Sequence, residues 1–150
     1  MPSYKKLETW ERAMTLVEDC YKATADFPRA ELYGLTSQIR RAAVSIAANV
    51  AEGYCRRTTR AYAHHVSIAL GSHGEVETCV ELAHRLGFIS RDHRDALENC
   101  TGPVGRLLSG LYRSLEEKIR REEAQNAVAA QKKEHTLPSP QPPAPSEKRS

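Results

Sequence analysis

An alanine-rich segment, residues 39–54, restricts the fold of this 150-residue chain more than any other feature of its sequence. It reads Ile-Arg-Arg-Ala-Ala-Val-Ser-Ile-Ala-Ala-Asn-Val-Ala-Glu-Gly-Tyr and carries the continuous apolar seam of an amphipathic helix. Its small side chains allow another helix to approach closely, while its arginines stay outside and can meet an anionic partner. The segment therefore predicts a tightly packed helical bundle with a basic surface rather than a catalytic pocket.

Apolar residues recur at helical spacing in four stretches, and no stretch alternates as a β-strand does. Helices are predicted over residues 7–25, 31–53, 58–86 and from residue 90 onward. The predicted apolar seams are Trp10, Met14, Val17 and Tyr21; Leu35, Ile39, Ala43, Ile46 and Val50; Tyr62, Val66, Ala69, His73, Val76, Val80 and Ala83; and Leu97, Val104, Leu108, Leu111, Leu115 and Ile119. The short connections favour an all-α, antiparallel up-down-up-down four-helix bundle.

Several residues predict where these helices end. Thr58 or Thr59 can cap the third helix, and Ser90 can cap the fourth. Gly53 fits the left-handed position that often closes a helix, here the second. Pro103 falls inside the fourth helix, where it should kink that helix or divide it in two.

The end of the chain differs in composition from the rest. Five of the eight prolines lie in residues 137–146, and proline permits neither a continuous helix nor a sheet. We therefore expect residues 1–123 to form the bundle, and residues 124–150 to be a fraying helix end followed by a disordered Pro-rich tail.

The chain carries no recognisable targeting or membrane segment. Its first residues lack an apolar secretory core, and no stretch reaches the roughly 18 apolar residues of a membrane span. Its four cysteines are far apart in sequence, without the close pairs of a metal knuckle. These features predict a cytoplasmic protein with reduced thiols that binds no metal.

Positive charge is concentrated in one part of the sequence. The net charge is only +3, but residues 29–60 hold six arginines against two glutamates. Guanidinium groups bind phosphate through paired hydrogen bonds, so this excess is typical of contact with a nucleic-acid backbone. The alternative is a solvated surface with ordinary ion pairs. The residues predicted to bind nucleic acid are Lys5, Lys6, Arg40, Arg41, Arg56, Arg57 and Arg60.

No arrangement of residues predicts catalysis. The chain has no nucleophile elbow and no phosphate-binding glycine loop, and Cys55 is separated by a hinge from the pair His64 and His65. We predict no enzymatic activity and no cofactor. His73 occupies a seam position and is either a core histidine with a hydrogen-bond partner or part of a polar layer at a subunit axis. In the second case, its protonation would loosen the assembly.

Residues 35–57 resemble the bacterial four-helix-bundle proteins encoded in intervening sequences of 23S rRNA genes. Residues 4–13, 67–78, 81–89 and 107–115 fit the same family, so the resemblance covers about residues 4–120. It implies a four-helix protomer, a barrel-like homopentamer and a basic surface. Accessory proteins of diversity-generating retroelements share this fold family, and their partners are a reverse transcriptase and its template RNA.

Taken with this resemblance, the sequence predicts a non-enzymatic, oligomeric accessory protein, most consistent with a pentameric ring. It would bind RNA or DNA backbone through its basic surface and assist either a reverse transcriptase or the RNA of an rRNA intervening sequence. The competing interpretation is a protein-interaction scaffold, in which the same basic surface meets an acidic protein and no nucleic acid is bound.

Overall fold

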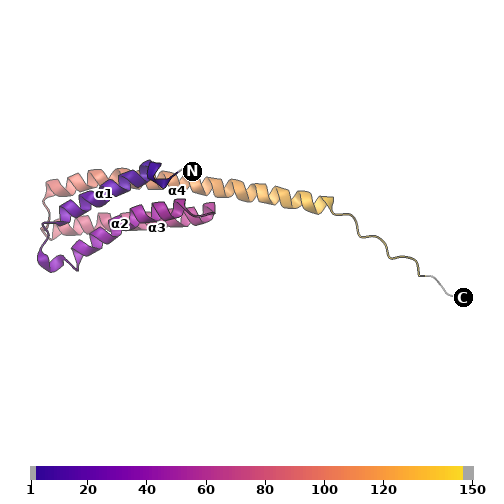
Figure 1. Ribbon diagram of the computed structural model, residues 1–150, viewed down its shortest axis with the longest axis horizontal. Helices are drawn as coiled ribbons and strands as arrows, with labels where there is room; N and C mark the ends of the chain where they lie inside the picture. The colour runs from indigo at the N-terminus through magenta and orange to yellow at the C-terminus, as the bar shows by residue number, and fades with distance from the viewer. Residues whose placement is uncertain (1–2, 147–150) are drawn as a thin grey trace. The chain divides into compact units, whose positions relative to one another are not determined.

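The computed structural model describes residues 3–146, and within that range it contains helices and no strand. Two short 3-10 helices precede the first two long helices. The elements are η1 (Tyr4–Lys6), α1 (Glu8–Thr24), η2 (Arg29–Glu31), α2 (Leu35–Tyr54), α3 (Thr59–Arg85) and α4 (Arg91–Thr136). The chain divides into two compact units, Met1–Ile119 and Arg120–Ser150. In the first unit, α1, α2, α3 and the first part of α4 lie side by side and alternate in direction, which confirms the predicted antiparallel four-helix bundle (Figure 1).

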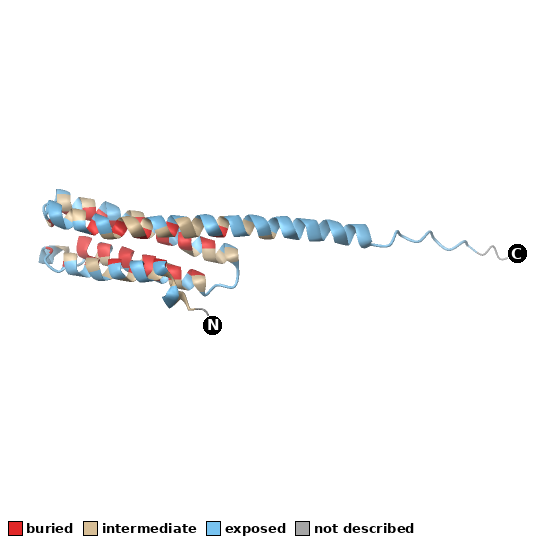
Figure 2. Ribbon diagram, turned by 90° about the horizontal axis from the view of Figure 1, so that it is seen from above, coloured by how far each residue is buried: buried red, intermediate tan, exposed pale blue. Residues whose placement is uncertain are grey.

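The predicted seams of α2, α3 and α4 form most of the core. All five predicted seam residues of α2 are buried, as are six of the seven in α3 and four of the six in α4. Figure 2 shows these buried residues along the facing sides of the helices. Apolar burial of this kind is the main source of stability in a bundle.

The predicted face of α1 was wrong by about one residue. Its buried apolar positions are Ala13, Leu16 and Cys20, whereas Tyr21 is 46% exposed. Adjacent residues in a helix differ by about 100° in direction, so such a shift moves the buried stripe around the helix. The periodicity of large apolar side chains favoured the predicted face. The buried face includes the small residues Ala13 and Cys20, which allow α1 to pack close to its neighbours.

Two of the predicted caps are confirmed by hydrogen bonds. The Ala61 amide donates to Thr58 Oγ1 at 3.1 Å at the start of α3, and the His93 amide donates to Ser90 Oγ at 3.2 Å at the start of α4. Each hydroxyl satisfies one of the amides that a helix N-terminus leaves without a partner.

Gly53 is not the left-handed cap that the sequence indicated, because it lies within α2 and has no positive φ. A Cβ atom at this position would come within 2.8 Å of both His65 Cβ and Tyr62 Cδ2. Gly53 therefore lies at a close contact between α2 and α3. Among the described residues, the one positive φ belongs to Gly87, in the turn between α3 and α4.

Pro103 does not divide α4, which continues as one helix through it. Proline has no amide to donate to the carbonyl four residues earlier, that of Asn99. Asn99 is exposed, so water can satisfy this carbonyl, and the helix tolerates the proline.

The second unit consists of the last part of α4, up to Thr136, followed by residues 137–146 without regular structure. The helix thus extends past the boundary expected at residue 123, and the division between units falls after Ile119. Disorder of the tail stays a prediction, and residues 147–150 lie outside the described part of the chain. None of the helices described is both long and apolar enough to cross a membrane.

Candidate nucleic-acid interface

Five of the seven cations predicted to bind nucleic acid lie at one end of the bundle, where α2 ends and α3 begins. Arg56, Arg57 and Arg60 occupy this turn and the first residues of α3. Lys5 and Lys6 come from η1, which packs beside the end of α2. Tyr4 of η1 lines a cavity of about 370 Å³ there, together with residues of α2 and of the turn that follows it: Ala48, Ala51, Glu52, Cys55 and Arg56. We call these five residues the basic end: Lys5, Lys6, Arg56, Arg57 and Arg60. All five are exposed.

Arg40 and Arg41 do not join this group. They lie 16 and 15 residues before Arg56 in the chain, which places them roughly 23 Å away along the helix axis. Arg40 Nε donates a hydrogen bond to Thr24 Oγ1 at 2.8 Å, and its guanidinium lies 4.5 Å from the centre of the Tyr21 ring. These contacts join α2 to α1, so Arg40 has a structural role.

Arg41 faces a separate groove between α2 and α3. This cavity of about 480 Å³ is lined by polar residues that include Ser45, Ser72 and Glu75. Gln38 Nε2 donates to Glu75 Oε1 at 3.2 Å across it. The carboxylate of Glu75 reduces the positive potential around Arg41, so this groove is less suited to an anion than the basic end.

A chain of hydrogen bonds connects the basic end to the α2–α3 contact. Arg56 Nε donates to His65 Nε2 at 3.2 Å, and the other ring nitrogen, Nδ1, lies 3.0 Å from Asn49 Oδ1. Asn49 Nδ2 donates to Ser45 Oγ at 3.1 Å, and this hydroxyl lies 2.8 Å from Ser72 Oγ. The chain holds the turn between α2 and α3 in place.

The donors in this chain fix the tautomer of His65. An arginine nitrogen can only donate, so His65 Nε2 accepts and the proton of the neutral ring lies on Nδ1. Nδ1 then donates to Asn49, and both ring nitrogens are engaged. These hydrogen bonds hold His65 between Arg56 and Asn49, and the absence of a catalytic pair with Cys55 stays a prediction.

The positive charge of Arg56 is partly neutralised by the carboxylate of Glu52. Arg56 Nη2 is 3.7 Å from Glu52 Oε1, an exposed ion pair of the kind that contributes little to stability. All five cations of the basic end are exposed, and Glu52 pairs with Arg56 among them. An excess of exposed cations attracts polyanions through counterion release.

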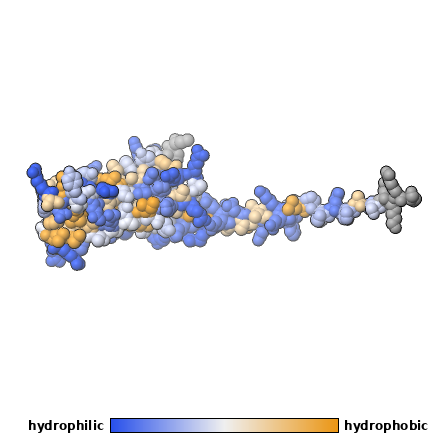
Figure 3. All heavy atoms as spheres, turned by 90° about the horizontal axis from the view of Figure 1, so that it is seen from below, coloured by the Kyte–Doolittle hydropathy of each residue, from blue (hydrophilic) through white to orange (hydrophobic). Residues whose placement is uncertain are grey.

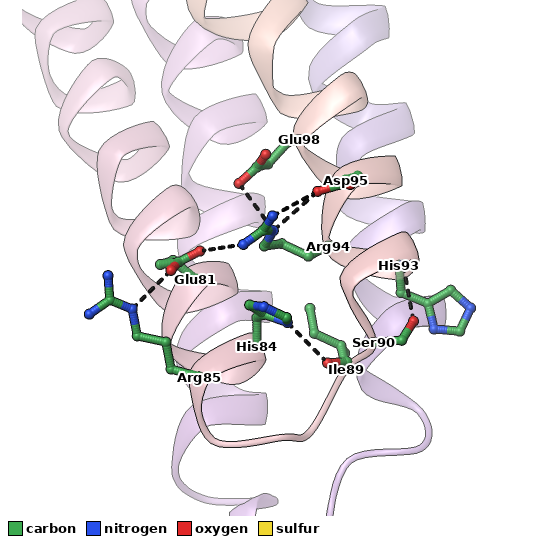
Figure 4. Close-up of polar contacts among 9 residues, drawn as sticks. All are labelled: Glu81, His84, Arg85, Ile89, Ser90, His93, Arg94, Asp95 and Glu98. Carbon is green, nitrogen blue, oxygen red and sulfur yellow. Dashed lines mark hydrogen bonds and ion pairs between the residues drawn. The ribbon is translucent and has the colours of Figure 1, made fainter.

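The other end of the bundle, at the turn between α3 and α4, pairs its charges. Arg94 lies 3.0 Å from Asp95, 3.4 Å from Glu81 and 3.8 Å from Glu98 (Figure 4). Arg85 Nε donates to Glu81 Oε1 at 2.9 Å, and this hydrogen bond is the main reason that the pKa of Glu81 is lowered. We call these five residues the paired end. The sequence did not single out this network, although the spacing of Glu81 with Arg85 and Arg94 with Glu98 is typical of helix ion pairs.

The thiols and the seam histidine have structural surroundings. Burial raises the pKa of Cys20 to about 12 and also raises the pKa values of Cys79 and Cys100. His73 Nε2 donates to the carbonyl of Thr101 at 2.9 Å, so it is a core histidine that joins α3 to α4. No group of three potential metal ligands occurs among the described residues.

Comparisons with known proteins identify the fold and the family. A family profile described as 23S rRNA-intervening sequence protein matches residues 5–110. The crystal structure of a protein of unknown function from the S23 ribosomal protein family of Bacteroides thetaiotaomicron VPI-5482 aligns with 69% of this chain and 97% of its own, with a TM-score of 0.63 and 21% identity. No curated protein matches the sequence. Neither match indicates a catalytic family. With more than half of its length matched, the chain belongs to the 23S rRNA-intervening sequence protein family.

Proposed function

We propose that this protein is a non-enzymatic, oligomeric accessory protein that binds the backbone of RNA or DNA through its basic end. The observation that carries the proposal is the gathering of five exposed cations at one end of the bundle, from η1 and from the turn and first residues that begin α3. Lysine and arginine side chains contact phosphates without reading sequence. The aromatic rings near this end pack on one another, Tyr54 against Tyr62 at 6.1 Å and Tyr4 against Trp10 at 5.5 Å, so base stacking is a minor contribution.

The test is fluorescence anisotropy of a labelled structured RNA and a random single strand at several salt concentrations. The triple variant Lys5→Gln, Lys6→Gln, Arg57→Gln should weaken binding, and the slope of log affinity against log salt should fall by about 2 for the single strand. The triple variant Lys22→Gln, Arg29→Gln, Arg91→Gln removes the same charge from exposed positions elsewhere. Equal effects from the two variants, or no effect from either, would contradict the proposed interface.

Self-association is the second part of the proposal. Ile68 and Leu82 of α3 are 40% and 44% exposed, Val44 of α2 is 43% exposed, and such residues can be covered by a second copy. Figure 3 shows groups of hydrophobic side chains among hydrophilic ones on one face of the bundle. The family resemblance favours a pentamer. Analytical ultracentrifugation measures the number of subunits. A monomer at micromolar concentration would contradict the proposed self-association.

The biological partner is either a reverse transcriptase with its template RNA or the RNA of an rRNA intervening sequence. Family membership supports both. Co-purification with a reverse transcriptase encoded beside this protein's gene would favour the first, and preferential binding of intervening-sequence RNA would favour the second. The exposed apolar residues also fit a protein-interaction scaffold, and absence of RNA binding at low salt would leave this as the better explanation.

A further inference from the structure

A groove between α3 and α4 carries a second concentration of positive charge, separate from the basic end. It has a volume of about 450 Å³ and is lined by Leu70 and His73 of α3 and by five residues of α4. The α4 residues are Gly102, Gly105, Arg106, Ser109 and Arg113. Among the described residues that line the groove, none is acidic.

The spacing of the α4 residues puts them on one face of the helix. Gly102, Arg106, Ser109 and Arg113 follow each other at steps of four, three and four residues. The two arginines are about 10 Å apart along the axis, and long side chains on a helix lean toward its N-terminus. Both arginines line the same groove, so a ligand that spans it can contact both guanidinium groups.

Gly105 makes room for the His73 ring, and Gly102 leaves the floor of the groove open. A Cβ atom at Gly105 would lie 2.6 Å from His73 Cε1, so the histidine ring occupies the space that a side chain would need. At Gly102, the nearest atom to such a Cβ is Arg106 Nη1 at 3.4 Å, which places the guanidinium over the floor. Glycine in a helix interior is unfavourable, so the open floor is maintained at a cost to helix stability.

His73 forms the wall of the groove in a fixed orientation. Its Nε2 donates to the carbonyl of Thr101, and Glu77 Oε1 lies 3.8 Å from the same nitrogen without lining the groove. Because the hydrogen bond and the close contact with Gly105 hold the ring, the shape of the groove is set before any ligand arrives.

We propose that this groove binds the phosphate group of a nucleotide, with Arg106 and Arg113 as the anion-binding residues and Ser109 as an additional donor. Guanidinium groups form paired, charge-assisted hydrogen bonds with phosphate oxygens. The volume lies within the range of small-ligand sites, about 300–1,000 Å³, and exceeds what a single ion needs. Leu70 supplies an apolar side wall. The phosphate group belongs either to a free nucleotide or to an RNA strand. The groove is separate from the basic end, so this proposal does not depend on the function proposed for the basic end.

Isothermal titration calorimetry with AMP, and anisotropy with a short single-stranded RNA, test the proposal on the full chain. The double variant Arg106→Gln, Arg113→Gln should weaken binding of at least one probe by about tenfold or more, because two charge-assisted contacts are lost. The double variant Arg29→Gln, Arg91→Gln removes the same net charge from exposed positions outside the groove and should change binding much less.

Gly102→Ala tests the shape of the groove without changing its charge. The added methyl group fills the floor beneath Arg106 and should weaken binding by about threefold or more, while the helix becomes no less stable, since alanine favours helix over glycine. Loss of AMP binding identifies a free-nucleotide site, and loss of RNA binding alone identifies a strand site.

Wild-type affinity of the Arg106→Gln, Arg113→Gln variant for both probes would overturn the proposal, as would equal losses in the Arg29→Gln, Arg91→Gln control. The Lys5→Gln, Lys6→Gln, Arg57→Gln variant separates this site from the basic end. It should keep AMP binding, even if the function proposed for the basic end proves wrong.

Discussion

The two ends of the bundle have similar densities of charged residues, yet their charges are arranged differently. At the paired end, the guanidinium of Arg94 has three carboxylates within 3.8 Å, and Arg85 shares one of them. At the basic end, five cations are exposed, and one of them, Arg56, lies 3.7 Å from Glu52. At the paired end, the charges join α3 to α4, whereas the cations of the basic end are exposed to solvent.

The comparison predicts that the arrangement of charges in space, and not their number in the sequence, decides which surface attracts an anion. A carboxylate a few ångströms away cancels most of the field of a cation at longer range. Unpaired exposed cations keep a field that extends about a Debye length into solvent, near 8 Å at physiological salt. The predictions below test whether the two ends differ in this way.

The largest expected effect concerns the thiols, which report on packing near each end. Cys20 is buried in α1, and burial raises its pKa from 9.0 to about 12, with Asp19 adding to the shift. It should therefore hold about a thousandfold less thiolate than an unperturbed thiol at pH below 9. Iodoacetamide should label Cys55, which is exposed at the turn after α2, long before Cys20. Mass spectrometry of tryptic peptides measures the two rates, and similar rates would contradict the packing.

The same shift predicts a loss of stability in alkali. Since the folded-state pKa of Cys20 is raised, the native chain keeps a proton that the unfolded chain releases above pH 9. The stability is full below pH 9 and is lost as pH rises toward 12. Urea unfolding across this range should show a smaller loss for Cys20→Ala than for the wild type, because the alanine variant lacks this titration.

The next effect tests the close helix contact that supports the basic end. Gly53→Val places a branched side chain where a Cβ alone would lie 2.8 Å from Tyr62 and His65. We expect a destabilisation of about 3 kcal/mol, because overpacking forces the helices apart. The matched control is Gly71→Val, where a Cβ meets nothing within 4 Å, and it should change stability by no more than about 0.5 kcal/mol. Equal unfolding midpoints in thermal circular dichroism would refute the close approach.

A further prediction concerns a variant in which the paired end loses its carboxylates. Glu81→Gln, Asp95→Asn, Glu98→Gln leaves Arg85 and Arg94 without their carboxylates. If unpaired cations attract RNA, the affinity for a single strand at low salt should rise by about threefold to tenfold, with a steeper salt dependence. Adding Arg85→Gln and Arg94→Gln to this variant should cancel the gain in RNA affinity. If the gain survives, it comes from the net charge of the protein and not from these two arginines.

The smallest effect is the loss of one cation from the paired end. Arg94→Gln removes the contacts that Figure 4 shows with Glu81, Asp95 and Glu98. Because these carboxylates are largely exposed, we expect a small decrease in the thermal midpoint at low salt that vanishes as salt is added. A large decrease that persists in high salt would mean that Arg94 stabilises the turn through packing.

The sequence predicted most of the fold, because apolar spacing reflects burial directly. The seams of α2, α3 and α4, together with the caps Thr58 and Ser90, are confirmed. The face of α1 was misplaced, since large side chains outweighed Ala13 and Cys20 in the pattern. The position of Gly53 in the sequence fits a helix cap. In the structure, however, a glycine is required there because α3 comes close to α2.

The candidate sites are harder to predict from the sequence than the fold is. Counting arginines grouped Arg40 with Arg56, although Arg40 bonds to Thr24 of α1 and the two lie far apart along α2. The groove containing Arg106 and Arg113 was missed, because its other wall comes from α3, more than 30 residues earlier in the chain. The seven-residue spacing of these arginines was the signal within the sequence that could have indicated a shared face.

The sequence by itself therefore determined the number of helices, most of their buried faces and their family, since these depend on spacing within each helix. The tertiary structure decided which cations are paired, which lie together at the basic end and which line the α3–α4 groove. The reason is range: hydrophobic periodicity is a property of neighbours in the chain, whereas an electrostatic field depends on every charge within a Debye length, whichever helix carries it.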